Sequence, residues 1–378
     1  MEADRKKILL VHLYANGDCL YATAVARQIK KDFPGAHLTW AILPAFQSIL
    51  KGNPYVDEIL PVEHVPKNDT IAFKHYRKTV IQQKIDGVWD ELFITANIDD
   101  NQALYDGTVR GMILRAYPQK ITVPLQPVLV LSDEEQKRVD DFAIQNNLSD
   151  FKHVILWEYA PQSGQSTLQM DWVKRMAEKI TSEIPSSCII LSSAHAFTST
   201  KNIIDASPLK VRENAALSHY CTLLIGCSSG ITWLCTSSAG KMLPMIQLLD
   251  PNAVFLNAPS NDFKRFDIRH EGLIEMTSWN EASLLDCVQL MVAGEKGRAF
   301  QLYNQSIPVS FKTTRKILYD RICFLQFHAF FKHISIMREV YGNNPNLYLA
   351  VLRAVISAPF KIIANQLRKK KTATKRSV

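Results

Sequence analysis

Short nonpolar runs alternate with amphipathic segments along the first part of the chain. Residues 7–13 (KILLVHL) and 37–43 (HLTWAIL) have the length and composition of buried strands. Between them, nonpolar residues recur every three or four positions, as they do on one face of a helix: Cys19, Ala22, Val25, Ile29 and Phe33. Pro34-Gly35 ends this helix. The three segments predict a βαβ unit with a right-handed crossover into a parallel sheet.

The alternation continues to residue 123. We predict further strands at 57–62, 91–95 and 120–123, and further helices at 45–51, 73–84 and 107–116. Pro124 and Pro127 then interrupt the pattern.

A second alternating series follows this break. Ser132, with Glu135 three residues later, predicts a capped helix start, and Asn146-Asn147 ends that helix. The expected strands and helices come after it: strands 153–158, 187–192, 222–226 and one near 243–249, and helices near 170–182, 213–219, 230–239 and 280–292. Two successive series predict an α/β protein of two Rossmann-like domains, whose parallel sheets face a cleft.

The end of the chain has a different pattern. Residues 313–340 are helical in periodicity and rich in phenylalanine, and residues 346–367 form an amphipathic stretch interrupted at Pro359. From Lys312 onward there are 14 Lys and Arg against 2 Asp and Glu, a net +12, although the whole chain carries only +8. The remainder is mildly acidic, so the basic pI is weak evidence for nucleic-acid binding, and we expect no nucleic-acid partner. A basic amphipathic extension favours an anionic membrane surface instead. The alternative is that these helices simply pack on the two domains, and both can hold at once.

Composition narrows the class of protein. Hydrophobic residues make up 47% and charged residues 21% of the 378 positions, which is typical of a globular chain. The run from Ile8 to Leu13 is too short for a secretory leader, so we expect a cytoplasmic protein. Seven cysteines without a CxxC pair favour free thiols. The histidines are scattered, so we expect neither a metal nor another cofactor.

The first candidate for chemistry is Asn16-Gly17-Asp18, after the first predicted strand. Ligands of open parallel sheets bind beyond the carboxyl ends of the strands, where this turn lies. Gly17 permits close approach of a ligand, and the Asp18 carboxylate is able to accept a proton from a hydroxyl. The alternative is that Asp18 only caps the following helix.

The second candidate is the segment 225–241 (IGCSSGITWLCTSSAGK). A strand leads through small polar residues into a helix, where backbone N–H groups are able to receive a phosphate. The residues proposed to contact it are Gly226, Ser228, Ser229, Gly230 and Thr232. The alternative is an ordinary strand–turn–helix connection with Ser228 as the cap.

Both segments resemble the heptosyltransferases, glycosyltransferase family 9 of the GT-B superfamily. Residues 8–40 are similar to the opening of that family, with Gly-Asp after the first strand and Phe-Pro-Gly after the helix, and residues 53–58 (NPYVDE) are similar to its N-P-x-V-D-E segment. The resemblance covers roughly residues 7–295. It implies that Asp18 is the general base of an inverting sugar transfer. It also implies that Gly17, the loop 226–232 and Ser163, Gln165 and Ser166 hold the nucleotide-sugar donor.

The chain departs from the family pattern on the donor side. Ser228 stands where the family has Asp, and Trp233 where it has His. Residues 158–166 contain no Lys to face the donor phosphates. Other basic residues are candidates to replace it: Lys201, Lys241, Lys264 and Arg265.

These observations lead to one expected function and two alternatives. The expected function is an inverting glycosyltransferase that moves a heptose or other hexose-like sugar from a nucleotide diphosphate to a cell-surface glycan or lipopolysaccharide-type, lipid-linked acceptor. It would work peripherally on the cytoplasmic face of the inner membrane. A nucleotide-sugar epimerase or hydrolase, and a non-catalytic glycan- or partner-binding protein, remain open. The predicted domains are 1–128 for the acceptor, 129–300 for the donor, and 301–378 as a helical extension.

Overall fold

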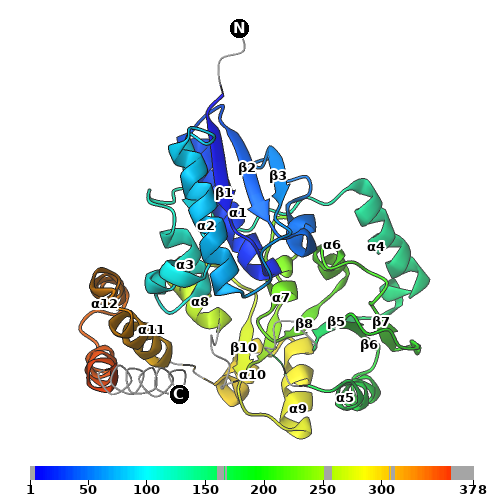
Figure 1. The fold of residues 1–378 in the computed structure, drawn as a ribbon. Helices are drawn as coiled ribbons and strands as arrows, with labels where there is room; N and C mark the ends of the chain where they lie inside the picture. The colour runs from blue at the N-terminus through cyan, green and yellow to red at the C-terminus, as the bar shows by residue number, and fades with distance from the viewer. Residues whose placement is uncertain are drawn as a thin grey trace, which may run out of the picture. The chain divides into compact units, whose positions relative to one another are not determined.

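The computed structural model describes residues 5–159, 166, 168–250, 258–305, 307 and 311–358. The chain divides into two compact units (Figure 1). We call the first, from Met1–Ile94 and Gln119–Ile307, the body, and the second, from Thr95–Pro118 and Pro308–Val378, the helical unit.

The first sheet of the body is parallel, with strand order β3-β2-β1-β4. Its strands are β1 (Lys7–Val11), β2 (His37–Ile42), β3 (Glu58–Pro61) and β4 (Glu91–Ile94), which confirms the predicted strands there. Its helices are α1 (Asn16–Asp32), the 3-10 helix η1 (Pro44–Leu50) and α2 (Thr70–Ile85). The alternation predicts parallel pairing correctly because both faces of each strand must be covered.

The strand predicted at 120–123 is wrong. The described residues 120–123 form no strand. The buried side chain of Gln28 in α1 accepts hydrogen bonds from the backbone N–H of Thr122 at 2.8 Å and of Val123 at 3.2 Å. A side chain therefore satisfies the donors that a neighbouring strand would otherwise take.

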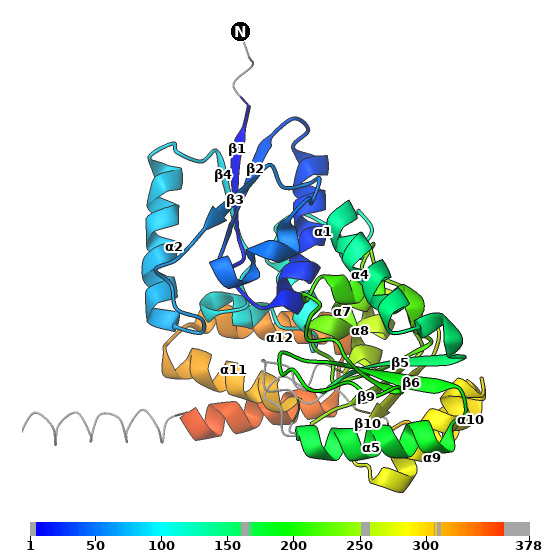
Figure 2. The same cartoon turned by 90° about the vertical axis from the view of Figure 1, so that its right-hand side faces the viewer.

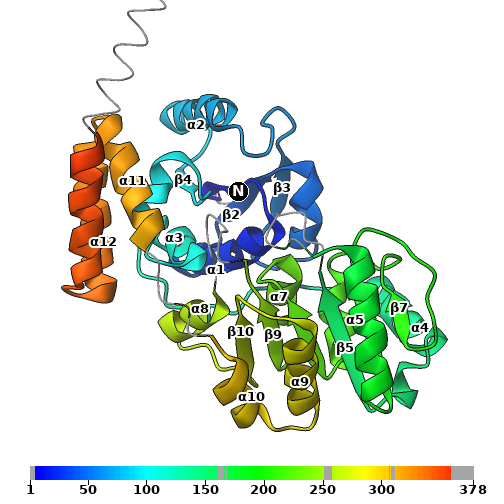
Figure 3. The ribbon, with the colours of Figure 1, turned by 90° about the horizontal axis from the view of Figure 1, so that it is seen from below.

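The second sheet is also parallel, with strand order β10-β9-β8-β5-β6-β7 (Figure 3). Its strands are β5 (His153–Glu158), β6 (Ser187–Ser192), β7 (Ile203–Asp205), β8 (Leu223–Gly226), β9 (Met245–Leu248) and β10 (Leu273–Met276). The accompanying helices are α4 (Asp133–Gln145), η3 (Leu148–Asp150), α5 (Met170–Glu183), α6 (Glu213–Leu217), η4 (Ser218–Tyr220), α7 (Gly230–Cys235), α8 (Pro259–Phe266), α9 (Glu281–Val292) and α10 (Lys296–Tyr303). The predicted strands and helices are found, while β7, β10, α8 and α10 were not predicted.

The helical unit combines two segments that lie far apart in the sequence. The first contributes η2 (Asp99–Leu104) and α3 (Val109–Arg115), and the second contributes α11 (Phe311–Cys323), α12 (Phe327–Tyr341) and a helix over residues 345–358. The three C-terminal helices lie side by side (Figure 2). The predicted single helix 313–340 is thus two helices, separated at Leu325, whose φ of 57° is left-handed. Of the stretch predicted at 346–367, the part after residue 358 lies outside the described residues.

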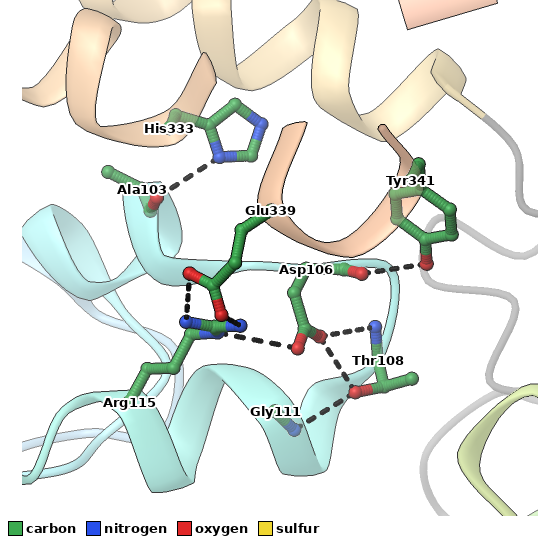
Figure 4. A network of polar contacts seen from close by, with 8 residues as sticks. All are labelled: Ala103, Asp106, Thr108, Gly111, Arg115, His333, Glu339 and Tyr341. Atoms are coloured by element: carbon green, nitrogen blue, oxygen red, sulfur yellow. Dashed lines mark hydrogen bonds and ion pairs between the residues drawn. The ribbon is translucent and has the colours of Figure 1, made fainter. Parts of the chain in front are cut away.

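Polar contacts tie α12 to the first segment (Figure 4). They join His333 Nδ1 to the Ala103 carbonyl at 3.0 Å, the Tyr341 hydroxyl to the Asp106 carbonyl at 2.7 Å, and the Arg115 guanidinium to the Glu339 carboxylate at 3.0 Å. Residues 95–118 therefore pack with the C-terminal helices, although we predicted them within the 1–128 domain. The compact units are defined by contacts between residues, whereas the predicted domains are defined by their roles in binding acceptor and donor. The predicted domain boundaries therefore stay a prediction.

Within the body, Arg212 joins the parts that carry the two sheets. Its guanidinium donates to the carbonyls of Ser48, Lys51 and Val130 and to the Glu135 carboxylate, the last at 3.0 Å. Both members of this ion pair are buried. A buried charge with so many partners is costly to disrupt, because its partners are left unsatisfied.

We expect Arg212→Met to lower the free energy of unfolding by about 3 kcal/mol or more, the usual loss when one partner of a buried ion pair is removed. Urea denaturation measures it. The control is Lys137→Met, which removes an exposed pair with Asp141 and should change stability little. Equal stability losses in the two variants would show that Arg212 does not hold the body together.

Candidate functional site

Gly17 and Asp18 lie in the first turn of α1, directly beyond the end of β1. The residue that precedes the helix is Ala15, with a left-handed φ of 71° and no capping side chain. The alternative interpretation of Asp18 as the helix cap is therefore wrong, since Asp18 is the third residue of the helix and is half-buried. Burial, and then the Asp18 charge, raise the pKa of the neighbouring Tyr14 to about 12.

The second candidate turn connects β8 to α7. Ser228 adopts a left-handed φ of 56°, and its backbone N–H donates to Gln247 Oε1 at 2.6 Å. The same oxygen accepts from the Thr232 hydroxyl at 3.3 Å. Ser228, Ser229 and Thr232 are all buried. The turn is thus held by the side chain of Gln247 on β9.

A carboxylate from the protein itself lies at the first turn of α7. Glu158, the last residue of β5, accepts hydrogen bonds from the Ser229 hydroxyl and from the backbone N–H groups of Ile231 and Thr232. Burial raises the pKa of Glu158 to about 7, and these hydrogen bonds oppose the rise. The position that we predicted for a donor phosphate therefore already has an internal acid beside it.

The two candidate turns meet inside the body. A Cβ atom on Gly17 would lie 3.0 Å from Trp233 Cδ1, and one on Gly230 would lie 3.3 Å from Asn16 Cβ. Helices α1 and α7 also pack on each other (Figures 1 and 3). A Cβ atom at position 17 or 230 would make a contact tighter than usual, so the neighbouring side chain would have to move by a few tenths of an ångström.

Trp233 fills the space beside the two glycines. Its ring centroid lies 5.0 Å from that of Tyr21 on α1 and 6.0 Å from that of Phe263 on α8, both in edge-on geometry. The side chain is buried. The residue that departs from the family pattern is thus a packing residue between three helices, where it adds edge-on aromatic contacts.

The remaining predicted donor residues are placed as follows. The hydroxyl of Ser166 accepts the backbone N–H of Leu168 at 3.2 Å. Ser163 and Gln165 lie outside the described residues. Gly226 ends β8, where a Cβ atom would lie 2.8 Å from Thr232 Oγ1. The structure therefore brings Gly17, Asp18 and the 226–232 turn together and leaves the other predicted contacts open.

Among the basic candidates, Lys264 and Arg265 are the two on a helix that contacts this site. They are exposed and follow Phe263, which packs on Trp233. The Lys241 ammonium group instead donates a hydrogen bond to the Cys221 carbonyl at 3.2 Å. Lys264 and Arg265 thus lie on the helix whose Phe263 contacts Trp233.

Glu158 and Gln247 were missed as site residues by the sequence reasoning. Glu158 ends a correctly predicted strand, so its place at the carboxyl edge of the sheet is a signal that could have found it. Gln247 lies within a strand, and its contact with Ser228 depends on the tertiary structure alone.

Three further features were sought in the described part of the chain: a metal-ligand cluster, disulfides and a membrane-spanning helix. There, no group of three or more His, Cys, Asp or Glu is arranged to hold a metal ion. All seven cysteines are free, as predicted, and six are buried. No described helix is long and nonpolar enough to cross a bilayer.

Comparison with solved structures identifies the fold. A glycosyltransferase of family 9 from Veillonella parvula superimposes with a TM-score of 0.51 at 15% identity, over 80% of this chain and 98% of that one. The ADP-heptose lipopolysaccharide heptosyltransferase II of E. coli superimposes with a TM-score of 0.51 at 13% identity, over 76% of this chain and 99% of that one. The chain has the fold of these glycosyltransferases. At such low identity the likeness concerns the fold alone.

This result confirms the predicted fold class, a GT-B arrangement of two parallel sheets with a helical extension. No protein-family model matches the chain, and no characterised protein matches it in sequence. The architecture therefore establishes the GT-B fold of this chain. A fold by itself does not assign a function, which depends on the residues of the site.

We expect the stability of the protein to depend on the Glu158 proton. Because burial raises the pKa from 4.5 to about 7, the folded state keeps a proton that the unfolded state releases. The stabilising contribution is complete below pH 4.5 and is lost as the pH rises through 7.

Between pH 5 and 8, the unfolding free energy of the wild type should therefore fall by roughly 2 kcal/mol relative to Glu158→Gln. Urea denaturation at both pH values measures it, with the exposed Glu134→Gln as the control. Parallel pH profiles for the wild type and Glu158→Gln would contradict a neutral buried acid.

A second prediction concerns the glycine contact. Gly17→Ala should destabilise the protein by about 1–3 kcal/mol, the usual cost of overpacking, because the new methyl group meets Trp233. The matched control is Gly297→Ala, since Gly297 is likewise the second residue of its helix and a Cβ there meets nothing within 4 Å. In the background Trp233→Leu, the cost of Gly17→Ala should shrink in a double-mutant cycle. An equal cost in both backgrounds would exclude the contact.

Proposed function

We propose that this protein is an inverting glycosyltransferase. It moves a hexose- or heptose-like sugar from a nucleotide-diphosphate sugar to a hydroxyl of a cell-surface glycan or lipopolysaccharide-type acceptor. The observation that carries the proposal is the contact between the Asp18 turn and the 226–230 turn inside a GT-B fold. The similar heptosyltransferase II of E. coli is an ADP-heptose enzyme, which makes a nucleoside diphosphate the donor class to test first.

Asp18 is the proposed general base. It lies at the carboxyl end of β1, in the first turn of α1, and is half-buried. In the proposed step, Asp18 takes the proton of the acceptor hydroxyl while that oxygen bonds to the anomeric carbon. The bond from that carbon to the diphosphate oxygen breaks, and a nucleoside diphosphate leaves. A single displacement of this kind inverts the anomeric centre.

The donor is assigned to the second sheet. Gly226, Ser228, Ser229, Gly230 and Thr232 are proposed to face the diphosphate, and Lys264 and Arg265 to offset its charge. No metal is proposed. Because an ionised Glu158 would repel the diphosphate, donor binding should be weaker at pH 8 than at pH 6.

A second candidate function is favoured by specific residues. Trp233 packs where the family pattern has His, and Glu158 occupies the first turn of α7. Both features are what a non-catalytic glycan- or partner-binding protein of this fold would tolerate. An epimerase or hydrolase remains the third possibility, since it needs a donor and no separate acceptor.

The protein is further proposed to act in the cytoplasm, peripherally on the inner face of the inner membrane, where a lipid-linked acceptor would lie. The basic C-terminal segment supports this placement, since 14 of the 44 basic residues follow position 311.

The decisive variant is Asp18→Asn. It should retain nucleotide affinity and lower the transfer rate by about a hundredfold or more, the usual size of a general-base contribution. The control is Asp32→Asn at the other end of the same helix, where the carboxylate accepts a hydrogen bond from Gln28. Thermal shift with ADP, UDP and GDP reports binding, and donor turnover with and without acceptor reports the reaction.

The three candidate functions give different results. Acceptor-dependent turnover that Asp18→Asn abolishes identifies a transferase. Turnover without acceptor identifies an epimerase or hydrolase. If no nucleotide raises the melting temperature of the wild type and no turnover is detected, only the non-catalytic glycan- or partner-binding protein is left.

A further inference from the structure

We propose that the helical unit inserts a nonpolar face into an anionic lipid bilayer, by way of the helix 345–358 and the turn between α11 and α12. The inference rests on the proposed function in one respect: a lipid-linked acceptor would place the enzyme at a membrane. It is carried by exposed side chains of the described residues and by their charge.

The helix 345–358 is nonpolar on two faces. One face is buried in the unit, where Ala354 packs with Leu318 of α11 and Phe330 of α12. The other face is exposed, with side chains at the spacing of one helical stripe that are between 41% and 56% accessible: Tyr348, Leu349, Leu352, Val355 and Ile356. Packing inside the unit therefore explains only one of the two faces.

The turn between α11 and α12 exposes a second nonpolar set. Its members are between 53% and 73% accessible: Phe324, Leu325, Phe327 and Phe331. Leu325 also has a left-handed φ of 57°, a conformation that costs energy for a branched side chain. Exposed nonpolar side chains gathered in this way mark a surface that interacts with a membrane or with another protein.

The charge of the unit selects a bilayer over a second copy of the chain. Residues 311–358 expose six basic side chains and one acidic side chain, Glu339; the basic ones are Lys312, Arg315, Lys316, Lys332, Arg338 and Arg353. Residues 359–378 add seven Lys and Arg and no acidic residue. Two such surfaces would repel each other, whereas an anionic headgroup layer attracts both.

The combination fits an interfacial seat. Nonpolar and aromatic side chains enter the boundary between headgroups and acyl chains, and flanking basic side chains reach the phosphates. No described helix is able to span the bilayer, so the contact is along the surface. Insertion of nonpolar side chains also makes a specific prediction: salt should weaken binding without abolishing it.

The test is sedimentation of the full-length protein with vesicles of phosphatidylcholine alone or of phosphatidylcholine mixed with the anionic lipid phosphatidylglycerol. The wild type should bind the anionic vesicles and retain part of that binding in high salt. The double variant Leu352→Gln, Ile356→Gln should bind at least ten times more weakly. The control is Ile71→Gln, Ile85→Gln, which changes two residues of α2 in the body that are even more exposed, at 71% each, and should bind as the wild type does.

Several results would overturn the inference. They are unchanged binding in the 352/356 variant, equal binding to neutral vesicles, and binding that high salt abolishes completely. So would a wild-type dimer in sedimentation velocity that the 352/356 variant converts to monomer, because the face would then be covered by a second copy. Circular dichroism and thermal unfolding of the variant confirm that it is folded.

Vesicle binding requires no turnover, so it separates this inference from the proposed function. Asp18→Asn should bind vesicles as the wild type does. Intact vesicle binding with no turnover in any assay would refute the transferase and leave the membrane surface. Normal transfer to a water-soluble acceptor with no vesicle binding would do the opposite.

Discussion

The close approach of α1 and α7 is the constraint on which the site depends. Two glycines, Gly17 and Gly230, form the contact, and Trp233 closes the space beside them. A Cβ atom at either glycine would crowd its neighbour, Trp233 Cδ1 at 3.0 Å or Asn16 Cβ at 3.3 Å, and the neighbour would have to yield by a few tenths of an ångström. The close packing of the Asp18 turn against the 226–230 turn therefore depends on the absence of two Cβ atoms and on the volume of one indole ring.

A buried acid determines the electrostatics of the 226–232 turn. Glu158 supplies the acceptor that the first N–H groups of α7 need, and its burial keeps its pKa near neutrality. The strand that ends in Glu158 thus stabilises the turn and at the same time determines how readily the turn receives another anion. Gln247 has the complementary role, because one amide oxygen satisfies both the Ser228 N–H and the Thr232 hydroxyl.

The helical unit is assembled from two segments that lie far apart in the sequence. Residues 95–118, late in the first alternating series, pack with the helices at the end of the chain. Arg115, Asp106 and His333 take part in the polar contacts between the two segments. Its buried side is small, so much of its nonpolar surface stays outside. This distribution distinguishes it from the body, where the strands of both sheets are largely covered.

The sequence by itself determined the two parallel sheets, the placing of Gly17 and Asp18 after β1, and the turn 226–230 before α7. These are local consequences of nonpolar periodicity and of glycine between a strand and a helix, which depend on residues close together in the chain. Only the tertiary structure decided that Gly17 meets Trp233, that Glu158 accepts hydrogen bonds from the first turn of α7, and that residues 95–118 pack with the C-terminal helices. Residues 120–123 show the same limit, since Gln28 takes the N–H groups that a strand would have used. Each of these contacts joins residues far apart in sequence, and their pairing depends on which surfaces remain uncovered after the sheets have formed.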